Sequence, residues 1–256
     1  MKKNIIFLPN ITVDDGKNRS APYQYSIKSW KQWAKKNNAE VIEWTELLCP
    51  VEEMKITFQR YYAMEILEAN GIEFDQVALI DSDTIVNPNA PNFFELTNNK
   101  FTAVVNDGNM DWLIRSIENY QKHLFNNETF GLTPWNYFNT GFMIMNETHK
   151  PFIKEFLQFY QDNKEKIQWL QTTYGVGTCQ PVINFFIRQK KIDLKLLPYE
   201  YNMVDLPLKE ILDEELTMTK IGHIYHFNCL SPDFKKHCGD VNYWMAKTYK
   251  HLYPND

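Results

Sequence analysis

Short apolar segments alternate with longer amphipathic segments through the first part of the sequence, and this alternation constrains the fold more than any other feature. Residues 4–10, 39–44 and 75–80 are apolar runs of strand length. Between them, residues 20–38 and 54–71 show the spacing of amphipathic helices. Alternating strands and helices favour a parallel sheet covered by helices. The pattern therefore predicts an α/β fold with a mainly parallel central sheet.

The first expected helix has a start signal and an apolar face. Ser20 is a candidate N-cap, and Pro22 falls in the first turn, where a missing amide hydrogen is tolerated. Ile27, Trp30 and Ala34 follow at helical spacing, so they predict the face that packs on the sheet.

The rest of the chain continues with similar segments. Its expected strands are residues 101–105, 137–146 and 194–198, and its expected helices are residues 150–160 and 179–191. Ser231 and Pro232 indicate a further helix start. No repeat and no Pro/Gly-rich linker divides the sequence. We therefore predict a single domain over residues 1–256.

Composition bears on partners and compartment. The formal net charge of −5 gives no basic field for wrapping nucleic acid. The 4 cysteines form no CxxC pair, which favours reduced thiols. The first apolar run is cut short at Pro9, and no run approaches the roughly 20 apolar residues of a membrane span. We expect a soluble, cytoplasmic chain with no transmembrane segment.

Two aspartates one residue apart follow the third expected strand. On an extended chain, positions i and i+2 face the same way, so Asp81 and Asp83 are expected to point to one side where the strand ends. Like charges held close require a cation, a substrate charge or open water. Ligands of such sheets bind beyond the carboxyl ends of the strands. A strand end followed by the polar turn Asn87-Pro88-Asn89 is the structural alternative.

Five segments stand in an order that resembles a known family. They are ALIDSDTIV, YFNTGFMIMN, CQPVINFF, LPYEYNM and IYHFN. Together they resemble glycosyltransferase family 8, the retaining galactosyl-, glucosyl- and glycogenin-like enzymes. The resemblance implies a single domain of the Rossmann-like GT-A fold. It also implies a nucleotide-binding half at about residues 1–108, and an acceptor and donor-sugar half with a C-terminal helix at about residues 109–256.

The resemblance implies a metal site made by Asp81, Asp83 and His226. In enzymes of this kind the two carboxylates hold a divalent metal, usually manganese, that bridges the diphosphate of a nucleotide-sugar. Oxygen ligands suit Mg²⁺ and Mn²⁺, and an imidazole shifts the preference toward Mn²⁺. Taken alone, His226 is better explained as a core histidine bonded to a carbonyl, and the order of the motifs is what favours a metal ligand. The expected cofactors are Mn²⁺ or Mg²⁺ and a nucleotide-sugar, with UDP as the expected nucleotide.

Further donor-site residues follow from the same resemblance. Asn139 matches an asparagine near the donor sugar, and Gln180 matches a glutamine beneath its anomeric carbon. The residue before that glutamine is commonly Asp in the family but is Cys179 here, which leaves the donor sugar open. Asp107 stands where the family often has a donor-binding carboxylate, although a plain turn also explains it. Arg60 resembles a basic donor contact, with an exposed helical arginine as the alternative.

The two ends of the motif series are less closely matched. The loop after the first strand offers Asn10, and with it Asp14, Asp15 and Tyr23, as candidate contacts to the base. After His226 the family has a lysine that contacts phosphate. Lys235 is the candidate here, Lys236 is its neighbour, and a solvated helix face is the competing interpretation. Asn202 matches a family position that can be structural.

The expected function is metal-dependent transfer of a hexose from a nucleotide-sugar to a glycan or other hydroxyl acceptor, with retention of configuration. The segment at residues 109–135, with Trp112 and Trp135, is expected to shape the acceptor site or to pack as a loop. Three alternatives remain at this point. They are a sugar-binding module without turnover, a haloacid dehalogenase-type phosphatase using Asp81 as nucleophile, and a zinc site made by His226, Cys229, His237 and Cys238.

Overall fold

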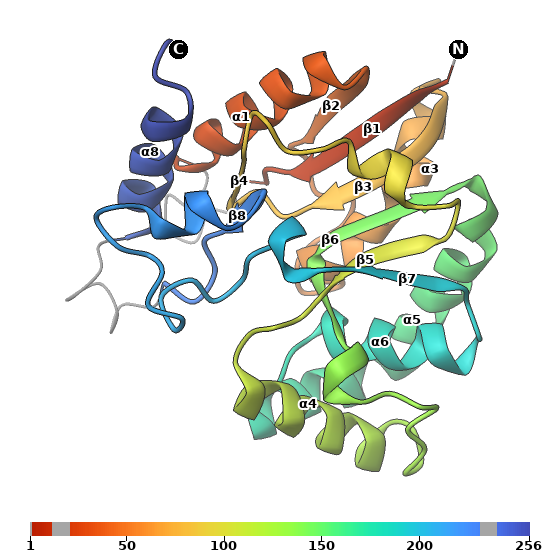
Figure 1. Cartoon of the computed structure of the whole chain (residues 1–256). Coiled ribbons are helices and arrows are strands. Elements are labelled where there is room, and N and C mark those ends of the chain that lie inside the picture. Colours follow the sequence, from red (N-terminus) through yellow and green to blue (C-terminus); the bar gives the residue numbers. More distant parts are fainter. Residues whose placement is uncertain (1, 12–20, 231–239) are drawn as a thin grey trace.

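The computed structural model describes residues 2–11, 21–230 and 240–256 (Figure 1). The strands are β1 (Lys3–Pro9), β2 (Ala39–Trp44), β3 (Phe74–Ile80), β4 (Thr84–Val86), β5 (Phe101–Val105), β6 (Phe138–Asn146), β7 (Leu194–Leu197) and β8 (Ile224–His226). The helices are α1 (Tyr23–Lys36), α2 (Ile56–Gln59), α3 (Ala63–Ala69), α4 (Met110–His123), α5 (Lys150–Tyr174), α6 (Cys179–Gln189) and α8 (Val241–Leu252). No helix of the described residues is both long and apolar enough to cross a membrane.

A six-stranded sheet in the order β2-β1-β3-β6-β5-β7 forms the centre of the molecule. β1 pairs in parallel with β2 and β3, and β5 pairs in parallel with β7. β6 lies antiparallel between β3 and β5, so the sheet is mostly but not wholly parallel. The predicted α/β fold is confirmed, with β6 as the one reversed strand in the six-stranded sheet of the described residues.

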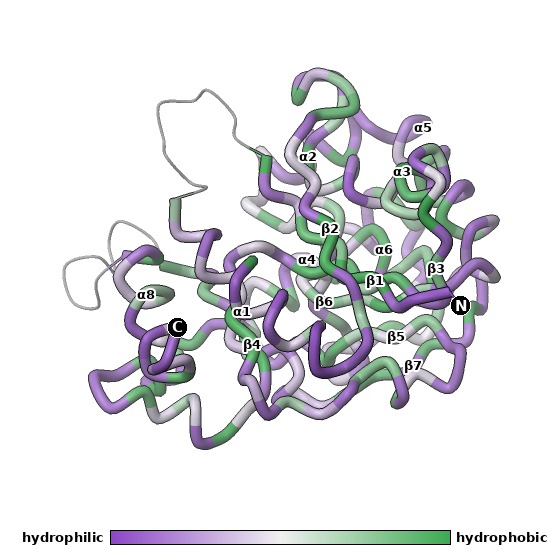
Figure 2. The backbone as a smooth tube through the Cα atoms, turned by 90° about the horizontal axis from the view of Figure 1, so that it is seen from above, coloured by the Kyte–Doolittle hydropathy of each residue, from purple (hydrophilic) through white to green (hydrophobic). Residues whose placement is uncertain are grey.

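The two faces of the sheet support two apolar clusters. Along β1, Ile5 and Phe7 belong to one cluster, whereas Ile6 and Leu8 belong to the other, as the two-residue period of a strand requires. α1 covers the second face with Trp30 and its neighbours, while helices α3, α5 and α6 cover the first (Figure 1). In Figure 2 the hydrophobic colour gathers on the central strands, and the peripheral loops are mostly hydrophilic.

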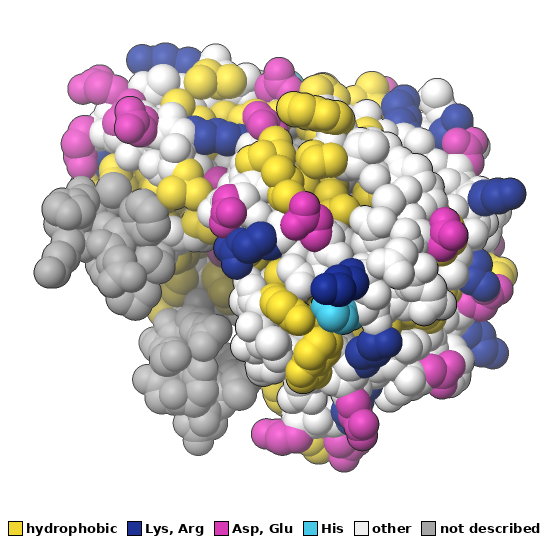
Figure 3. Space-filling model, turned by 90° about the horizontal axis from the view of Figure 1, so that it is seen from below, with side chains coloured by type: hydrophobic (Ala, Val, Ile, Leu, Met, Phe, Trp, Pro, Cys, Tyr) yellow, Lys and Arg dark blue, Asp and Glu magenta, His cyan; other side chains and the backbone are white. Residues whose placement is uncertain are grey.

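A small two-stranded sheet of β4 and β8 stands beyond the carboxyl end of β3. It packs with α8 around a third apolar cluster, which includes Ile85, Tyr225, Trp244 and Tyr249. Helix α8 begins at Val241, whereas the helix start expected at Ser231 and Pro232 lies outside the described residues. On the face of the molecule shown in Figure 3, acidic and basic side chains are interspersed rather than segregated.

Three details differ from the sequence expectations or extend them. The helix expected over residues 54–71 is divided by a 3₁₀ turn at Arg60–Tyr62, which pattern reasoning misses because both helix types repeat apolar residues every three or four positions. Helix α4 was not predicted within residues 109–135, although its cap Asn109 accepts a hydrogen bond from the amide of Trp112. The caps expected at Ser20 and Ser231 lie outside the described residues.

Candidate active site

Asp81 and Asp83 lie in the turn between β3 and β4, and His226 is the last residue of β8. The β4–β8 register pairs Thr84 with His226, and the amide of Phe227 donates to the carbonyl of Asp83 at 2.8 Å. This pairing places His226 beside the two aspartates, although about half of the chain separates them in the sequence. Nε2 of His226 lies 3.0 Å from Oδ1 of Asp83 and 3.8 Å from Oδ2 of Asp81. The candidate ligand atoms of all three residues lie within 4.8 Å of one another.

The charges of this cluster are strongly coupled. Burial lowers the pKa of His226, but the carboxylates of Asp83, Asp81 and Asp205 outweigh burial and raise that pKa to about 9. Burial raises the pKa of Asp83, yet the adjacent His226 outweighs it, so the pKa of Asp83 is lowered. At neutral pH a protonated His226 therefore pairs with the carboxylate of Asp83, and a divalent cation bound here would take the place of the Nε2 proton of His226.

Arg60 supplies a second positive charge. Its side chain is buried, its Nη1 pairs with Oδ1 of Asp81, and its Nη2 donates to the carbonyl of Thr140 at 2.9 Å. Burial lowers the pKa of Arg60, but the adjacent carboxylate of Asp81 outweighs burial and raises it. The alternative of an exposed helical arginine is wrong. Because Arg60 holds Oδ1 of Asp81, Oδ2 is the oxygen of Asp81 that faces His226.

Strand β6 brings the expected donor-sugar residues to the same place. The pairing of β5 with β6 is irregular between Ala103 and Val104, and Asn139 lies at this irregularity. Its Nδ2 donates to Oε1 of Gln180 at 3.1 Å, and the amide of Thr140 donates to the same oxygen at 3.1 Å. Both Asn139 and Gln180 are 8 % exposed. The structure therefore holds the Gln180 carboxamide in a fixed orientation against β6.

Gly141 is a site residue that the sequence did not single out. A Cβ atom at this position would lie 2.5 Å from Cε1 of His226, 2.8 Å from Oδ1 of Asn139 and 2.9 Å from Oδ2 of Asp81. The cluster closes only because this residue has no side chain. The Asn-Thr-Gly segment cannot reveal this in a single sequence, since two of the three contacts, those with His226 and Asp81, come from other segments of the chain.

Cys179 lies beside these groups. Its thiol is buried, and Sγ is 3.8 Å from both Nη2 of Arg60 and Oγ1 of Thr140. The family's usual aspartate would place a full negative charge against Arg60 at this point. With Cys179 at this position, Arg60 has Asp81 as its ion-pair partner.

Asp107 is not one of the residues whose candidate ligand atoms converge. Its side chain is 62 % exposed, and its Oδ2 lies 3.4 Å from Nζ of Lys209. The neighbouring buried carboxylate is Asp205, whose Oδ2 accepts from the amide of Asn109 at 2.6 Å and whose Oδ1 accepts from Nδ2 of Asn228 at 2.7 Å. Asp205 thus ties the loop after β5 to the loop after β8. The sequence gave no signal for this role, because Asp205 stands in no motif.

The remaining candidates lie near the ends of the site or beyond the described residues. Asn10 follows β1, donates through Nδ2 to Glu43 at 2.6 Å, and stands next to Pro9, whose carbonyl accepts from Oγ of Ser82 at 2.5 Å. This contact places the end of β1 against the turn of the two aspartates. Asp14, Asp15, Lys235 and Lys236 lie outside the described residues.

The two tryptophans of residues 109–135 differ in environment. Trp112 is partly buried, and its ring stands where a Cβ on Gly177 would come within 2.8 Å, so it packs the loop before α6. Trp135 is 79 % exposed.

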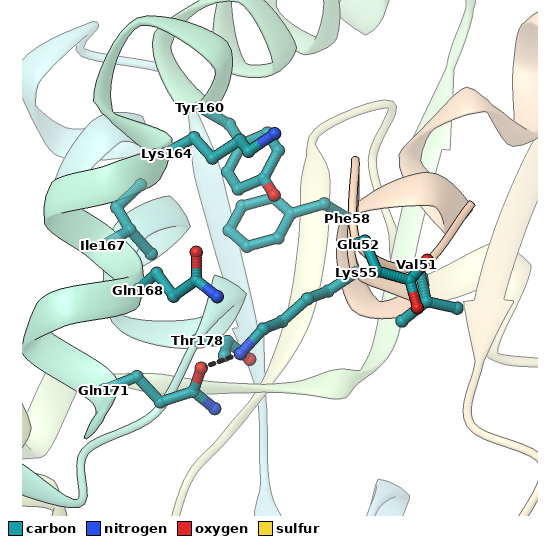
Figure 4. A pocket seen from close by; sticks show the side chains of 10 residues that line it. All are labelled: Val51, Glu52, Lys55, Phe58, Tyr160, Lys164, Ile167, Gln168, Gln171 and Thr178. Carbon is teal, nitrogen blue, oxygen red and sulfur yellow. Dashed lines mark hydrogen bonds between the residues drawn. The ribbon is translucent and has the colours of Figure 1, made fainter. Parts of the chain in front are cut away.

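A separate cavity of about 50 Å³ lies between α5 and residues 51–58 and includes Lys55 and Thr178 (Figure 4). This volume is too small for a nucleotide-sugar.

The donor set fits a divalent cation. Two carboxylates and an imidazole converge. This mixed oxygen and nitrogen set is more typical of a Mn²⁺ or Mg²⁺ site than of a structural zinc site. In the part of the chain that the structure describes, no cysteine joins the cluster, and Sγ of Cys229 instead donates to Oδ1 of Asp205 at 2.8 Å. His237 and Cys238 of the zinc alternative lie outside the described residues.

Comparison with known proteins identifies the fold and the family. A family model described as glycosyl transferase family 8 matches residues 12–231. No curated protein sequence matches the chain. One similar solved structure is a glycosyltransferase involved in the glycosylation of the major capsid of PBCV-1, with a TM-score of 0.54, 11 % identity, and coverage of 98 % of this chain and 99 % of that one.

Two further solved structures have a similar fold. The galactosyltransferase LgtC, in complex with donor and acceptor sugar analogues, has a TM-score of 0.50 and 12 % identity over 98 % of this chain and 95 % of that one. Mouse xyloside xylosyltransferase 1 has a TM-score of 0.51 and 13 % identity over 91 % of this chain and 99 % of that one. At these identities the structural similarity shows a shared fold.

Proposed function

This chain belongs to glycosyl transferase family 8 and is a glycosyltransferase, and from that premise we propose that it transfers a hexose from a UDP-sugar to a hydroxyl acceptor with retention of configuration. The acceptor class that fits the family is a glycan or another hydroxyl compound. The observation that carries the proposal is the convergence of Asp81, Asp83 and His226 beside the residues that the resemblance assigns to the donor sugar.

Asp81, Asp83 and His226 are the residues that would hold Mn²⁺ or Mg²⁺. The metal would supply positive charge to the diphosphate, which gains negative charge when the sugar leaves. His226 must give up its Nε2 proton to act as a ligand. Arg60 keeps its charge under all conditions and stays within reach of the same diphosphate through its position beside Asp81.

Retention is supported by the character of Gln180. A neutral carboxamide is a poor nucleophile and a poor base, so a long-lived covalent intermediate is not expected. We propose that the bond from the anomeric carbon to the diphosphate oxygen breaks, that the acceptor oxygen bonds to the same face, and that the acceptor proton passes to the leaving diphosphate. Asn139 and Thr140 hold Oε1 of Gln180, which fixes the carboxamide beneath the sugar.

The two halves of the chain have separate contributions in this proposal. Residues 1–108 supply Arg60 and the two aspartates, together with Asn10 at the end of β1. Residues 109–256 supply His226 and Gln180, with Asn139, and the acceptor side. Asp107 and Lys235 are proposed as further donor contacts. In a single domain of this kind, the metal site would join the two halves.

A panel of nucleotide-sugars tests the proposal. The purified chain is incubated with UDP-glucose, UDP-galactose, UDP-xylose and GDP-mannose, with Mn²⁺ or with excess EDTA, and release of free nucleotide is measured. We expect hydrolysis of at least one UDP-sugar with Mn²⁺ and none with EDTA. Equal nucleotide release with and without chelator would contradict the proposed metal dependence. Release from GDP-mannose alone would contradict UDP as the nucleotide of the donor.

A second candidate is a sugar-nucleotide binding module without turnover, and Cys179 is the observation that favours it. A thiol replaces the carboxylate that binds sugar hydroxyls in the family, which removes a charged hydrogen bond from the donor site. Binding of UDP-sugars by calorimetry without any nucleotide release, together with release by Cys179→Asp, would support the module over the enzyme.

A further inference from the structure

Asn202 lies between the metal cluster and the donor-sugar residues. It is fully buried, and both ends of its side chain are hydrogen-bonded. Oδ1 of Asn202 lies 3.2 Å from Nδ1 of His226, and Nδ2 of Asn202 donates to Oδ1 of Asn139 at 2.9 Å. One carboxamide therefore contacts both the candidate metal ligand and the residue that holds Gln180.

The direction of every hydrogen bond in this chain of contacts is fixed by a backbone group. The amide of Gly141 donates to Oδ1 of Asn139 at 2.7 Å, so that oxygen must be an acceptor. The atom of Asn202 that faces it must then be the NH₂ group, and the other atom of Asn202, its carbonyl oxygen, faces His226. A carbonyl oxygen only accepts, so Nδ1 of His226 carries a hydrogen.

This assignment decides which nitrogen of His226 can bind a metal. With the hydrogen on Nδ1, the lone pair of a neutral imidazole is on Nε2, and Nε2 is the atom that faces Asp81 and Asp83. Metal-bound histidines generally donate their other ring nitrogen to an oxygen that fixes the ring and its tautomer. Asn202 supplies that oxygen here.

We propose that Asn202 is a positioning residue that sets the tautomer and ring orientation of His226 and, through its second hydrogen bond, aligns Asn139 and Gln180 with the metal site. The inference rests on the proposed metal-dependent function. It assigns two separable tasks to the two ends of one side chain. The carbonyl end serves the metal ligand, and the NH₂ end serves the donor-sugar residues.

Two substitutions separate these tasks. Asn202→Ala removes both hydrogen bonds and leaves Nδ1 of His226 without its acceptor. Asn202→Asp has nearly the same shape, and its carboxylate still accepts from Nδ1 of His226. Its second oxygen, however, faces Oδ1 of Asn139, so two acceptors oppose each other at the 2.9 Å contact. The aspartate variant thus keeps the contact with His226 and breaks the contact with Asn139.

Asn184 offers a matched control. It is also fully buried, and its side chain accepts from the amide of Phe138 at 2.9 Å and donates to the carbonyls of Phe138 and Gln180 at 2.9 Å. It does not contact His226 in the part of the chain that the structure describes. Asn184→Ala therefore removes a buried asparagine of the same kind without touching the metal cluster.

The test measures Mn²⁺ dissociation constants by the electron paramagnetic resonance signal of free Mn²⁺, thermal unfolding of each variant, and the rate of nucleotide release. We expect Asn202→Ala to weaken Mn²⁺ binding by about 10- to 100-fold. Asn202→Asp should bind Mn²⁺ within about threefold of the wild type or more tightly, while its rate falls by about 10-fold or more. Asn184→Ala should keep the wild-type Mn²⁺ affinity at a lowered unfolding temperature.

The outcomes are distinguishable. Wild-type Mn²⁺ affinity in Asn202→Ala overturns the inference, and so does a loss of affinity in Asn202→Asp equal to that in Asn202→Ala. Equal losses in Asn184→Ala and Asn202→Ala show a general effect of destabilisation and also overturn it. If Asn202→Ala does not fold, the comparison of Asn202→Asp with the wild type decides. Absence of Mn²⁺ binding by the wild type contradicts the proposed function itself.

Discussion

Replacing Gly141 with alanine should disrupt the candidate metal site, because the added methyl group would overlap groups of that site. The new Cβ would lie 2.5 Å from Cε1 of His226, 2.8 Å from Oδ1 of Asn139 and 2.9 Å from Oδ2 of Asp81. These distances are about half an ångström to one ångström short of van der Waals contact. Gly141 lies inside a buried strand, so the backbone has little room to move away.

The expected magnitude follows from this overlap. Overpacking of a buried position costs about 1–3 kcal/mol of folding free energy. Metal sites tolerate ligand displacements of only about 0.2 Å, and relief of the overlap would move His226 or Asp81 by more than that. We expect the Mn²⁺ affinity of Gly141→Ala to fall at least about 10-fold, which is about 1.4 kcal/mol. Denaturant unfolding and Mn²⁺ titration by electron paramagnetic resonance measure the two effects separately.

Gly71→Ala is the matched control. Gly71 has a φ of +69° and nothing within 4 Å of a Cβ atom, so its substitution strains the backbone without crowding any group. We expect it to cost about 1 kcal/mol of stability and to leave Mn²⁺ binding unchanged. Wild-type Mn²⁺ affinity in Gly141→Ala, or an equal loss in both variants, would refute the reasoning about close packing at the cluster.

Three other predictions follow from the same geometry. The pKa of His226 is raised to about 9, so Mn²⁺ must displace a proton from His226 at neutral pH. The apparent Mn²⁺ affinity should therefore rise about tenfold per pH unit below that pKa and level off above it. A flat affinity profile from about pH 6 to 9 in the same Mn²⁺ titration would count against His226 as a ligand. Asp83→Asn should abolish metal-dependent nucleotide release while its circular dichroism spectrum stays unchanged, and retained release would show that Asp83 is not needed. Gln180→Ala should slow transfer by about 10-fold or more with little change in UDP affinity. The product that the wild type makes from an α-linked donor should show α-anomeric coupling constants in its NMR spectrum. A β-linked product would exclude retention.

The fold was largely accessible from the sequence because its signals are local. The apolar runs at β1, β2 and β3 and the intervening amphipathic spacing needed no knowledge of distant residues. The reversed direction of β6 was not accessible in the same way. Its apolar run reads the same in either direction, and its orientation is set by its pairing with β3 and β5. Helix α4 was missed although it carries a usable signal in its cap Asn109 and the spacing of Leu113, Ile117 and Tyr120.

The site divides in a similar way. The pair Asp81 and Asp83 was visible in the sequence because only one residue separates them, although they lie in a turn and not on the extended chain from which their convergence was predicted, and His226 followed from the resemblance. Gly141 and Asn202 stand in segments that match the family, and Asp205 stands in none, but the roles of all three depend on contacts with segments far away in the chain. Their roles become visible only when β4 pairs with β8 and the 202–205 loop packs beside it.

Anomalous diffraction from crystals grown with Mn²⁺ and UDP would test the central claim most directly. Data collected at the manganese absorption edge locate the ion without reference to activity. The account predicts a single strong anomalous peak about 2.0–2.3 Å from Nε2 of His226 and from carboxylate oxygens of Asp81 and Asp83, with the diphosphate of UDP on its open side. A peak only at another position, or no peak at these three residues, would contradict it.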